Sequence, residues 1–369
     1  MTLKTTSYRQ ASLLRASARA RGFSLVELMV GMAIGLVLVA GLSLLFANTS
    51  QSGNELNKSI RQIENGRYAM DLLHDDLMLA GYYGEVPADS LATSSPNLCT
   101  TSGAVALGWD ATIPSTPKVP PPIVGLSDDE ASALTCLPNR LAGTRAFAVH
   151  RLDTDTIAPA AITTKTENVL YVQTSRCLAD PATSPFIASS DPDELILKEK
   201  DCTTPSSARK YISRIYYIAS CNECGVDTVP TLKMAELRGN QMVPVPLAEG
   251  IENMVLEYGF DTTDPLDADP ATHASKGVPD TFLDKLSGVV GARDNDWANV
   301  VAARVHLLSR TTEPSRGYND TGRFYVLGPS TTASGDTSGF KRRVYTSTVR
   351  IINVAGRRET PPPAPAASS

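Results

Sequence analysis

The apolar positions of this 369-residue chain form one long run near the N-terminus, followed by short alternating segments. Residues 23–46 contain a single ionisable side chain, Glu27. At about 1.5 Å per residue, this run predicts a helix of roughly 36 Å, which is long enough to cross a bilayer. Over residues 47–80, apolar side chains recur every three or four positions among charged ones, which predicts an amphipathic second half of the same helix.

The amphipathic half needs a partner surface, and its expected packed face consists of Leu56, Ile60, Ile63, Met70, Leu73 and Leu77. The helix is expected to end near Gly81, which Gly84 and Pro87 follow. Close to this end, the cluster His74, Asp75 and Asp76 suggests either a metal site or a solvated helix face. We favour the solvated face.

The remainder of the chain reads as loops and strands. Residues 87–145 are rich in proline and small polar residues, so we expect long surface loops there. Beyond them, alternation such as Met254, Leu256, Tyr258 and Phe260 predicts half-buried strands with one packed face. The expected strands are 145–150, 169–173, 211–219, 232–238, 251–260, 299–309, 323–327 and 344–353.

These patterns predict an α+β fold, in which a long N-terminal helix packs on an antiparallel β-sheet head with long loops. A parallel, doubly wound sheet is not expected, because no long helical pattern separates the strands. The expected organisation is a leader over 1–22, a membrane-spanning half-helix over 23–46, an amphipathic half-helix over 47–80, a β-rich head over 81–358 and a Pro/Ala-rich disordered tail over 359–369.

The leader carries five basic side chains and no acidic one, which predicts a cytoplasmic N-terminus and a head on the other side of the membrane. Its removal would take the formal net charge from −5 to −10. This negative charge on the rest of the chain argues against a nucleic-acid partner.

Glu27 is the unusual residue of the apolar run, because a carboxylate within a bilayer is costly unless it finds a partner. The small residue Gly22 lies before the run, so cleavage there would leave the helix attached and place a free amine on Phe23. The amine of one helix can meet Glu27 of a neighbouring chain that is shifted along the axis. Such a contact is head to tail, does not close, and builds a filament.

Residues 22–28, Gly-Phe-Ser-Leu-Val-Glu-Leu, resemble the prepilin cleavage and methylation motif of type IV pilins and of type II secretion pseudopilins. The resemblance implies that prepilin peptidase cuts between Gly22 and Phe23, that the Phe23 amine is N-methylated, and that Glu27 docks an incoming subunit. The alternative is a plain signal anchor with a chance acid.

Segments 250–259, 305–310, 342–350 and 353–358 resemble the C-terminal strands of the PilW family of minor pilins. The family implies a single-pass inner-membrane protein with a periplasmic head, which contacts lipid before assembly and later belongs to the pilus at the cell surface. Its implied partners are the major pilin, other minor pilins and an inner-membrane assembly platform. Its implied role is to prime pilus assembly, and proteins of this family can sit at the fibre tip. Two alternatives stay open, a larger minor pseudopilin of a type II secretion system and a pilus-borne adhesin that binds through residues 87–250.

All six cysteines follow the membrane run, which fits an oxidising compartment. Among fifteen pairings, local closure favours Cys99 with Cys136, Cys177 with Cys202, and Cys221 with Cys224. The last pair, in a Cys-Asn-Glu-Cys sequence, could instead be a redox or zinc motif. A structural disulfide is preferred, because the sequence shows neither a second zinc-ligand pair nor a thioredoxin-like βαβ pattern.

No enzyme and no cofactor are expected. The weak candidates for calcium binding are Asp261, Asp264, Asp267 and Asp269, which lack the glycine-centred EF-hand pattern. The four histidines, His74, His150, His273 and His306, lie far apart and in no recognisable catalytic motif.

Overall fold

A computed structural model describes residues 22–86, 92–111, 117–163, 168–177, 180, 185–263, 276–285 and 296–359. The chain divides into two units, Met1–Leu56 and Asn57–Ser369. The helix α1 (Leu25–Leu79) begins in the first unit and ends in the second. The second unit also holds all the described strands, which are mostly antiparallel, so the structure has the long helix and the antiparallel head that the sequence predicts.

The head part of α1 packs through residues spaced three or four apart, namely Gln62, Gly66, Ala69, Met70, Leu73, Asp76 and Leu77. The prediction was wrong for Leu56 and Ile60, whose side chains are 61% and 40% exposed. Polar Gln62 and small Gly66 occupy the packed face in the preceding turns. The helix ends before Gly81, whose φ of 71° suits a residue without a Cβ.

The larger sheet has seven antiparallel strands, arranged around β7 (Ala208–Ala219). β7 pairs with β4 (Ala146–Leu152), β5 (Tyr171–Thr174) and β8 (Thr231–Arg238). The outer strands are β3 (Ile123–Leu126), β6 (Phe186–Ser189) and β9 (Gln241–Glu249). β9 was not predicted; it contains Pro244 and Pro246, which an edge strand tolerates.

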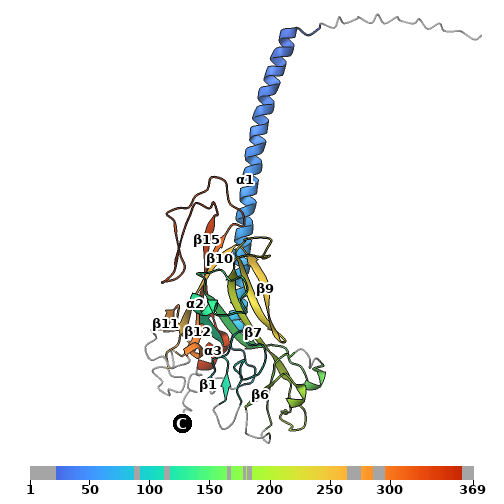
Figure 1. The fold of residues 1–369 in the computed structure, drawn as a ribbon, viewed down its shortest axis with the longest axis vertical. Helices are drawn as coiled ribbons and strands as arrows, with labels where there is room; N and C mark the ends of the chain where they lie inside the picture. Colours follow the sequence, from blue (N-terminus) through green and yellow to red (C-terminus); the bar gives the residue numbers. More distant parts are fainter. Residues whose placement is uncertain are drawn as a thin grey trace, which may run out of the picture. The chain divides into compact units, whose positions relative to one another are not determined.

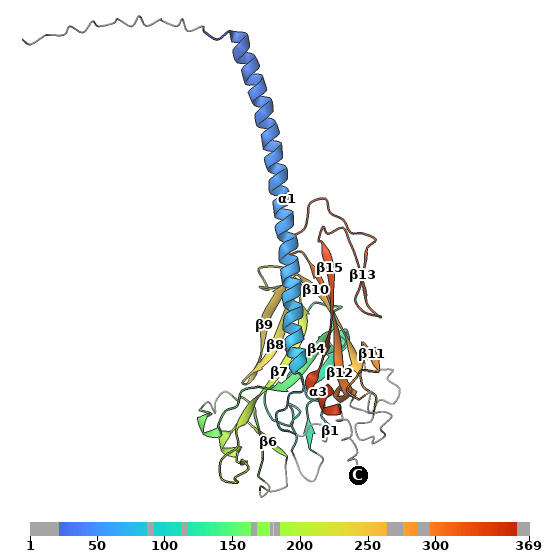
Figure 2. The same cartoon turned by 180° about the vertical axis from the view of Figure 1, so that it is seen from behind.

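The smaller sheet has four antiparallel strands in the order β11 (Thr281–Leu283), β10 (Ile251–Phe260), β12 (Val300–Arg310) and β15 (Arg342–Arg350). Figures 1 and 2 show α1 passing beside strands of both sheets. The predicted strand 344–353 ends at Arg350, and the short helix α3 (Ile352–Arg358) follows it.

The remaining elements are short. β1 (Ala92–Thr93) and β2 (Lys118–Val119) form a parallel pair, and β13 (Phe324–Val326) and β14 (Thr332–Ser334) form a hairpin. The helix α2 (Asp128–Ser132) and the 3₁₀ turns η1 (Pro159–Ala161), η3 (Pro192–Glu194) and η5 (Asp296–Asn299) lie in connections. The region 87–145, predicted to be irregular, thus contains β1, β2, β3 and α2 in its described part.

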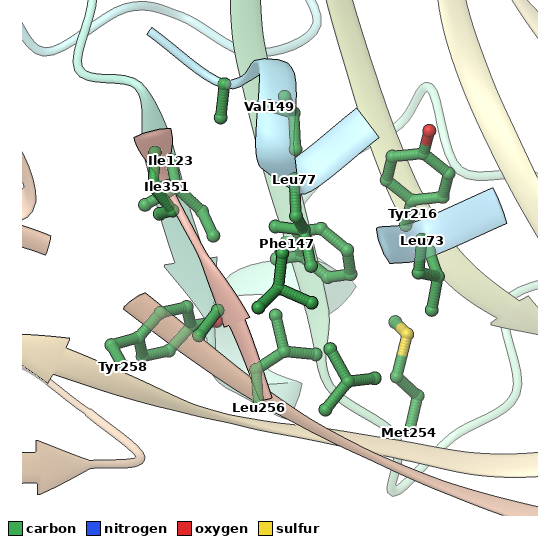
Figure 3. Packing of buried hydrophobic residues seen from close by; sticks show 14 of the residues in the cluster. Leu73, Leu77, Ile123, Phe147, Val149, Tyr216, Met254, Leu256, Tyr258 and Ile351 are labelled. Carbon is green, nitrogen blue, oxygen red and sulfur yellow. The ribbon is translucent and has the colours of Figure 1, made fainter. Parts of the chain in front are cut away.

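One apolar core joins α1 to both sheets (Figure 3). Leu73 and Leu77 of the helix meet Phe147 of β4 and Leu256 of β10, and all four side chains are buried. Full burial of one such side chain contributes about 1.5–3 kcal/mol. The two sheets are therefore held together under the helix.

The alternating strand β10 packs as predicted on one face but was wrongly expected to be open on the other. Val255 of β10 and Leu308 of β12 are buried on that second face against Leu327. The chain between β12 and β15 supplies Leu327 and the β13–β14 hairpin, so it forms a further layer.

Candidate processing and assembly site

The side chains of Ser24 and Glu27 cap the start of α1. The Glu27 carboxylate oxygen Oε2 accepts a hydrogen bond from the Ser24 backbone N–H at 3.0 Å, and the Val26 N–H donates to Ser24 Oγ at 3.3 Å. These two hydrogen bonds satisfy two donors at the N-terminus of the helix. The Ser-x-x-Glu spacing was visible in the sequence, but we read Glu27 there only as a docking acid. Phe23, just before the cap, has an 87% exposed side chain.

The apolar part of α1 is the one described helix long and apolar enough to cross a membrane, judged by length and composition. Its side chains are exposed along the whole run. The hydroxyls of Ser43 and Thr49 each donate to a backbone carbonyl four residues earlier, at 2.8 Å. Because these polar groups are satisfied within the helix, they add little to the cost of an apolar environment.

Asp76 fixes the other end of α1 to the larger sheet. Its Oδ1 accepts from Arg151 Nε at 3.0 Å and Arg214 Nη1 at 2.9 Å, and its Oδ2 accepts from the Tyr216 hydroxyl at 2.7 Å. Burial acts to lower the pKa of Arg214, but the carboxylates of Asp76 and Glu236 raise it above its ordinary value. The partners come from β4 and β7, so this cluster ties the helix to two strands.

The interpretation of residues 74–76 as a solvated face was therefore wrong for Asp76, which is 5% exposed. Its neighbours do lie in solvent, since the side chains of His74 and Asp75 are 43% and 80% exposed. Sequence alone offers no signal for this difference, because the partners of Asp76 lie 75 to 140 residues away.

Near the start of the head, Gln62 holds α1 to the smaller sheet and its flanking chain. Gln62 Nε2 donates to the carbonyl oxygens of Ser309 and Lys341, each at 2.9 Å. One turn later, Gly66 leaves room for the ring of Tyr345, which a Cβ at that position would overlap. Polar contacts at residues 62 and 76 thus bracket the apolar contacts of the helix.

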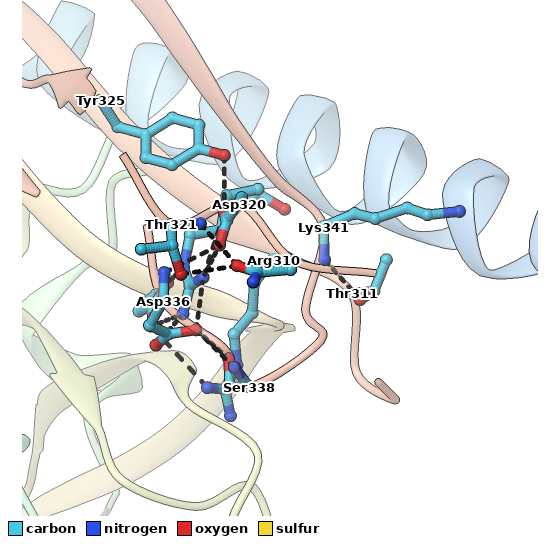
Figure 4. Close-up of polar contacts among 12 residues, drawn as sticks. Arg310, Thr311, Asp320, Thr321, Tyr325, Asp336, Ser338 and Lys341 are labelled. Atoms are coloured by element: carbon cyan, nitrogen blue, oxygen red, sulfur yellow. Dashed lines mark hydrogen bonds and ion pairs between the residues drawn. The ribbon is translucent and has the colours of Figure 1, made fainter. Parts of the chain in front are cut away.

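An ionic cluster supports the chain between β12 and β15. Arg342 Nε donates to Glu252 Oε2 at 2.7 Å, and its Nη atoms reach Asp320 and Asp336 at 3.3 and 3.0 Å. The Tyr325 hydroxyl also donates to Asp320, at 2.8 Å (Figure 4). Burial acts to raise the pKa of Asp320, but these hydrogen bonds hold it below its ordinary value.

The carboxylate of Asp261, one of the calcium candidates, accepts hydrogen bonds from within the protein. Its Oδ2 accepts from Arg358 Nε and from the Gly277 N–H, each at 2.7 Å, and the residue is fully buried. The other candidates, Asp264, Asp267 and Asp269, lie outside the described residues. Within the described ranges, no group of three His, Cys, Asp or Glu side chains could hold a metal ion.

The histidines are not brought together by the described structure. His150 is buried with Nδ1 at 2.7 Å from the Pro121 carbonyl oxygen, and burial lowers its pKa to about 4. His306 Nε2 lies 2.7 Å from Glu257 Oε1. His273 lies outside the described residues.

Three disulfides join Cys99 to Cys136, Cys177 to Cys202, and Cys221 to Cys224. The first two close chain separations of 37 and 25 residues within loop-rich parts of the head. The third closes a separation of three residues between β7 and β8.

Two family models match this chain, one at the start of α1 and one in the C-terminal half of the head. Residues 17–43 match the family model described as the prokaryotic N-terminal methylation motif, and residues 215–353 match the one described as type IV pilus-assembly protein W, PilW. Among solved structures, the type IV-like pilin TTHA1219 from Thermus thermophilus aligns over 80% of this chain and 98% of its own, with 12% identity and a TM-score of 0.35. No curated protein sequence matches the chain.

Proposed function

Since this chain is a PilW-family type IV pilin, we propose that it is a minor pilin that enters the filament through α1 after cleavage between Gly22 and Phe23. One observation carries the proposal. An exposed apolar helix begins with a single carboxylate, Glu27, five residues after Gly22. In this proposal prepilin peptidase removes the leader, and the Phe23 amine is then methylated.

The geometry at Glu27 suits a docking role. The capping bond uses Oε2, and a carboxylate has two oxygens with about four acceptor sites. Glu27 can therefore keep its own helix capped while it accepts the charged amine of an adjacent subunit. In a low-dielectric filament core this pair is much stronger than it would be in water.

The contacts at Gln62 and Asp76 support the second half of the proposal, in which the helix carries the head into the filament. Gln62 binds backbone carbonyls around the smaller sheet, and Asp76 binds side chains of the larger sheet. A subunit anchored at both points follows its helix as one body. We infer a periplasmic head that joins other minor pilins and the major pilin at the assembly platform, where it primes assembly and can occupy the tip.

Replacement of Glu27 tests docking. We expect Glu27→Ala to insert and be cleaved as usual, but to reach sheared fibres at least tenfold less, which corresponds to a loss of about 1.4 kcal/mol or more. Glu64→Ala is the matched control, because Glu64 is an exposed carboxylate on the head part of the same helix. Equal incorporation of the two variants would refute ionic docking.

Cleavage is tested by the mass of the mature N-terminus from sheared fibres, which should begin with methylated Phe23. Gly22→Leu should leave a longer, unprocessed chain on a gel. A variant with the mobility of the mature wild type would show that the site is elsewhere. Assembly with the outer-membrane components of a type II secretion system, in place of a pilus, would identify the protein as a pseudopilin.

A further inference from the structure

The disulfide between Cys221 and Cys224 lies in the tight connection between β7 and β8, and the two cysteine residues differ in exposure. Cys221 is buried at 6% exposure, whereas Cys224 is exposed. Cys224 is therefore the half of the bond that lies toward solvent, on the side from which an external thiol would approach. The pair lies in a connection between two antiparallel strands and not at the start of a helix, so it differs from the active site of a thioredoxin-like domain.

The backbone of this connection is held without help from the disulfide. The Asp227 carboxylate accepts from the N–H groups of Asn222, Glu223 and Val229 at 2.8, 2.7 and 3.0 Å. These backbone hydrogen bonds lower the pKa of Asp227, so the carboxylate remains charged at neutral pH. Opening the disulfide would leave this set of contacts in place.

The length of the closed loop also separates this bond from the other two. The stabilisation that a disulfide gives by restricting the unfolded chain grows with loop length. The pairs of Cys99 and Cys177 close separations of 37 and 25 residues, but Cys221 and Cys224 are separated by three. The third disulfide therefore stabilises the folded state least of the three.

Lys233 of β8 provides a charge beside the sulfur of Cys224. Its Nζ lies 3.7 Å from Cys224 Sγ and donates to the Asn222 carbonyl at 2.9 Å. Burial lowers the pKa of Lys233, and the nearby Asp227 acts to raise it. An ammonium group at this distance stabilises a thiolate on Cys224, which favours the reduced form of the pair.

We propose that the Cys221–Cys224 disulfide is a thiol–disulfide exchange site, which a dithiol oxidoreductase can open and close while the head stays folded. A thiolate of the reductant attacks Cys224 Sγ, the Cys221–Cys224 bond breaks, and Cys221 leaves as a thiolate that takes a proton from water. The second thiolate of the reductant attacks its own sulfur in the mixed disulfide, and Cys224 leaves as a thiolate beside Lys233. The reductant gives up two electrons and ends as a disulfide.

The test uses the full chain in detergent, equilibrated in glutathione buffers of increasing reducing strength, alkylated and mapped by peptide mass. We expect Cys221 and Cys224 to be labelled in buffers that leave the other two disulfides intact, with the near-ultraviolet circular dichroism of the head unchanged. Simultaneous reduction of all three bonds, or reduction of this bond last, would overturn the proposal. This measurement needs no variant.

Lys233→Met then tests the role of the ammonium. It should shift the equilibrium constant toward the disulfide by about tenfold, or about 30 mV. Lys210→Met, on β7 outside the connection, is the control and should leave the constant unchanged. An unchanged constant in a folded Lys233→Met protein would refute the role of Lys233.

Discussion

Replacement of Asp76 by alanine tests whether a buried ionic cluster fixes α1 on the head. The change removes a carboxylate that accepts three hydrogen bonds and pairs with two guanidinium groups. Arg214 keeps Glu236 as a partner at 2.7 Å. Arg151, whose side chain is 10% exposed, loses its charge partner, and the buried Tyr216 hydroxyl loses its acceptor.

The expected cost follows from what remains unpaired. Removal of one partner from a buried ion pair typically destabilises by about 3–5 kcal/mol, because the remaining charge has little access to water. For the second unit, which spans 313 residues, an unfolding entropy of about 2.1 cal/mol/K per residue means that this loss lowers the melting temperature by roughly 5–8 °C. Asp76→Asn keeps an acceptor for Tyr216 but not the charge, so its melting temperature should lie between those of Asp76→Ala and the wild type.

The assay is thermal unfolding of the full chain in detergent, followed by the fluorescence of its two tryptophans. Trp109 packs edge-on against Tyr83, and Trp297 packs edge-on against Tyr258, so both report on the packing of the head. Asp75→Ala is the matched control, since that side chain is 80% exposed. If Asp76→Ala melts within about 1 °C of Asp75→Ala, the cluster does not anchor the helix.

Three further predictions follow from single contacts. The unfolded chain binds more protons than the folded one between the folded pKa of His150, about 4, and its ordinary value of 6.5. Stability should therefore be complete above pH 6.5 and fall by about 2 kcal/mol on going to pH 5. Denaturant titrations should show this loss in the wild type but not in His150→Gln, and equal losses would contradict it. Gly66→Ala should lower the melting temperature, because the new Cβ would overlap the Tyr345 ring. Gly356→Ala, in open space on α3, should raise the free energy of unfolding by up to about 1 kcal/mol. A gain in stability in both variants would show that Tyr345 moves away freely. Peptide mapping without reductant should recover the three disulfide pairs described above, and a peptide linking cysteines of different pairs would contradict this pairing.

What the sequence predicted well depends on local pattern. The apolar run, its single acid and the alternation in β10 are periodic features within a few residues of each other, and they predicted the helix and the antiparallel head. β9 was not predicted, and its two prolines, Pro244 and Pro246, are compatible with a strand because β9 lies at an edge of the sheet, which only the sheet order shows. Asp76 was misread because its ion pairs form across long separations that no local pattern encodes.

The polar residues on the packed face of α1 fix the position of the helix along its axis, which apolar packing alone does not fix. Ala69, Leu73 and Leu77 repeat at nearly every turn, so a slide of the helix by one turn, about 5.4 Å, would replace one apolar contact with another. Gln62 and Asp76 lie fourteen residues apart, or about 21 Å along the axis, and each has partners fixed in a different sheet. A slide of one turn would leave both without those partners, at a cost of several kcal/mol. The apolar residues therefore supply adhesion between helix and head, and these two polar residues set the register that a subunit pulled by its helix must keep.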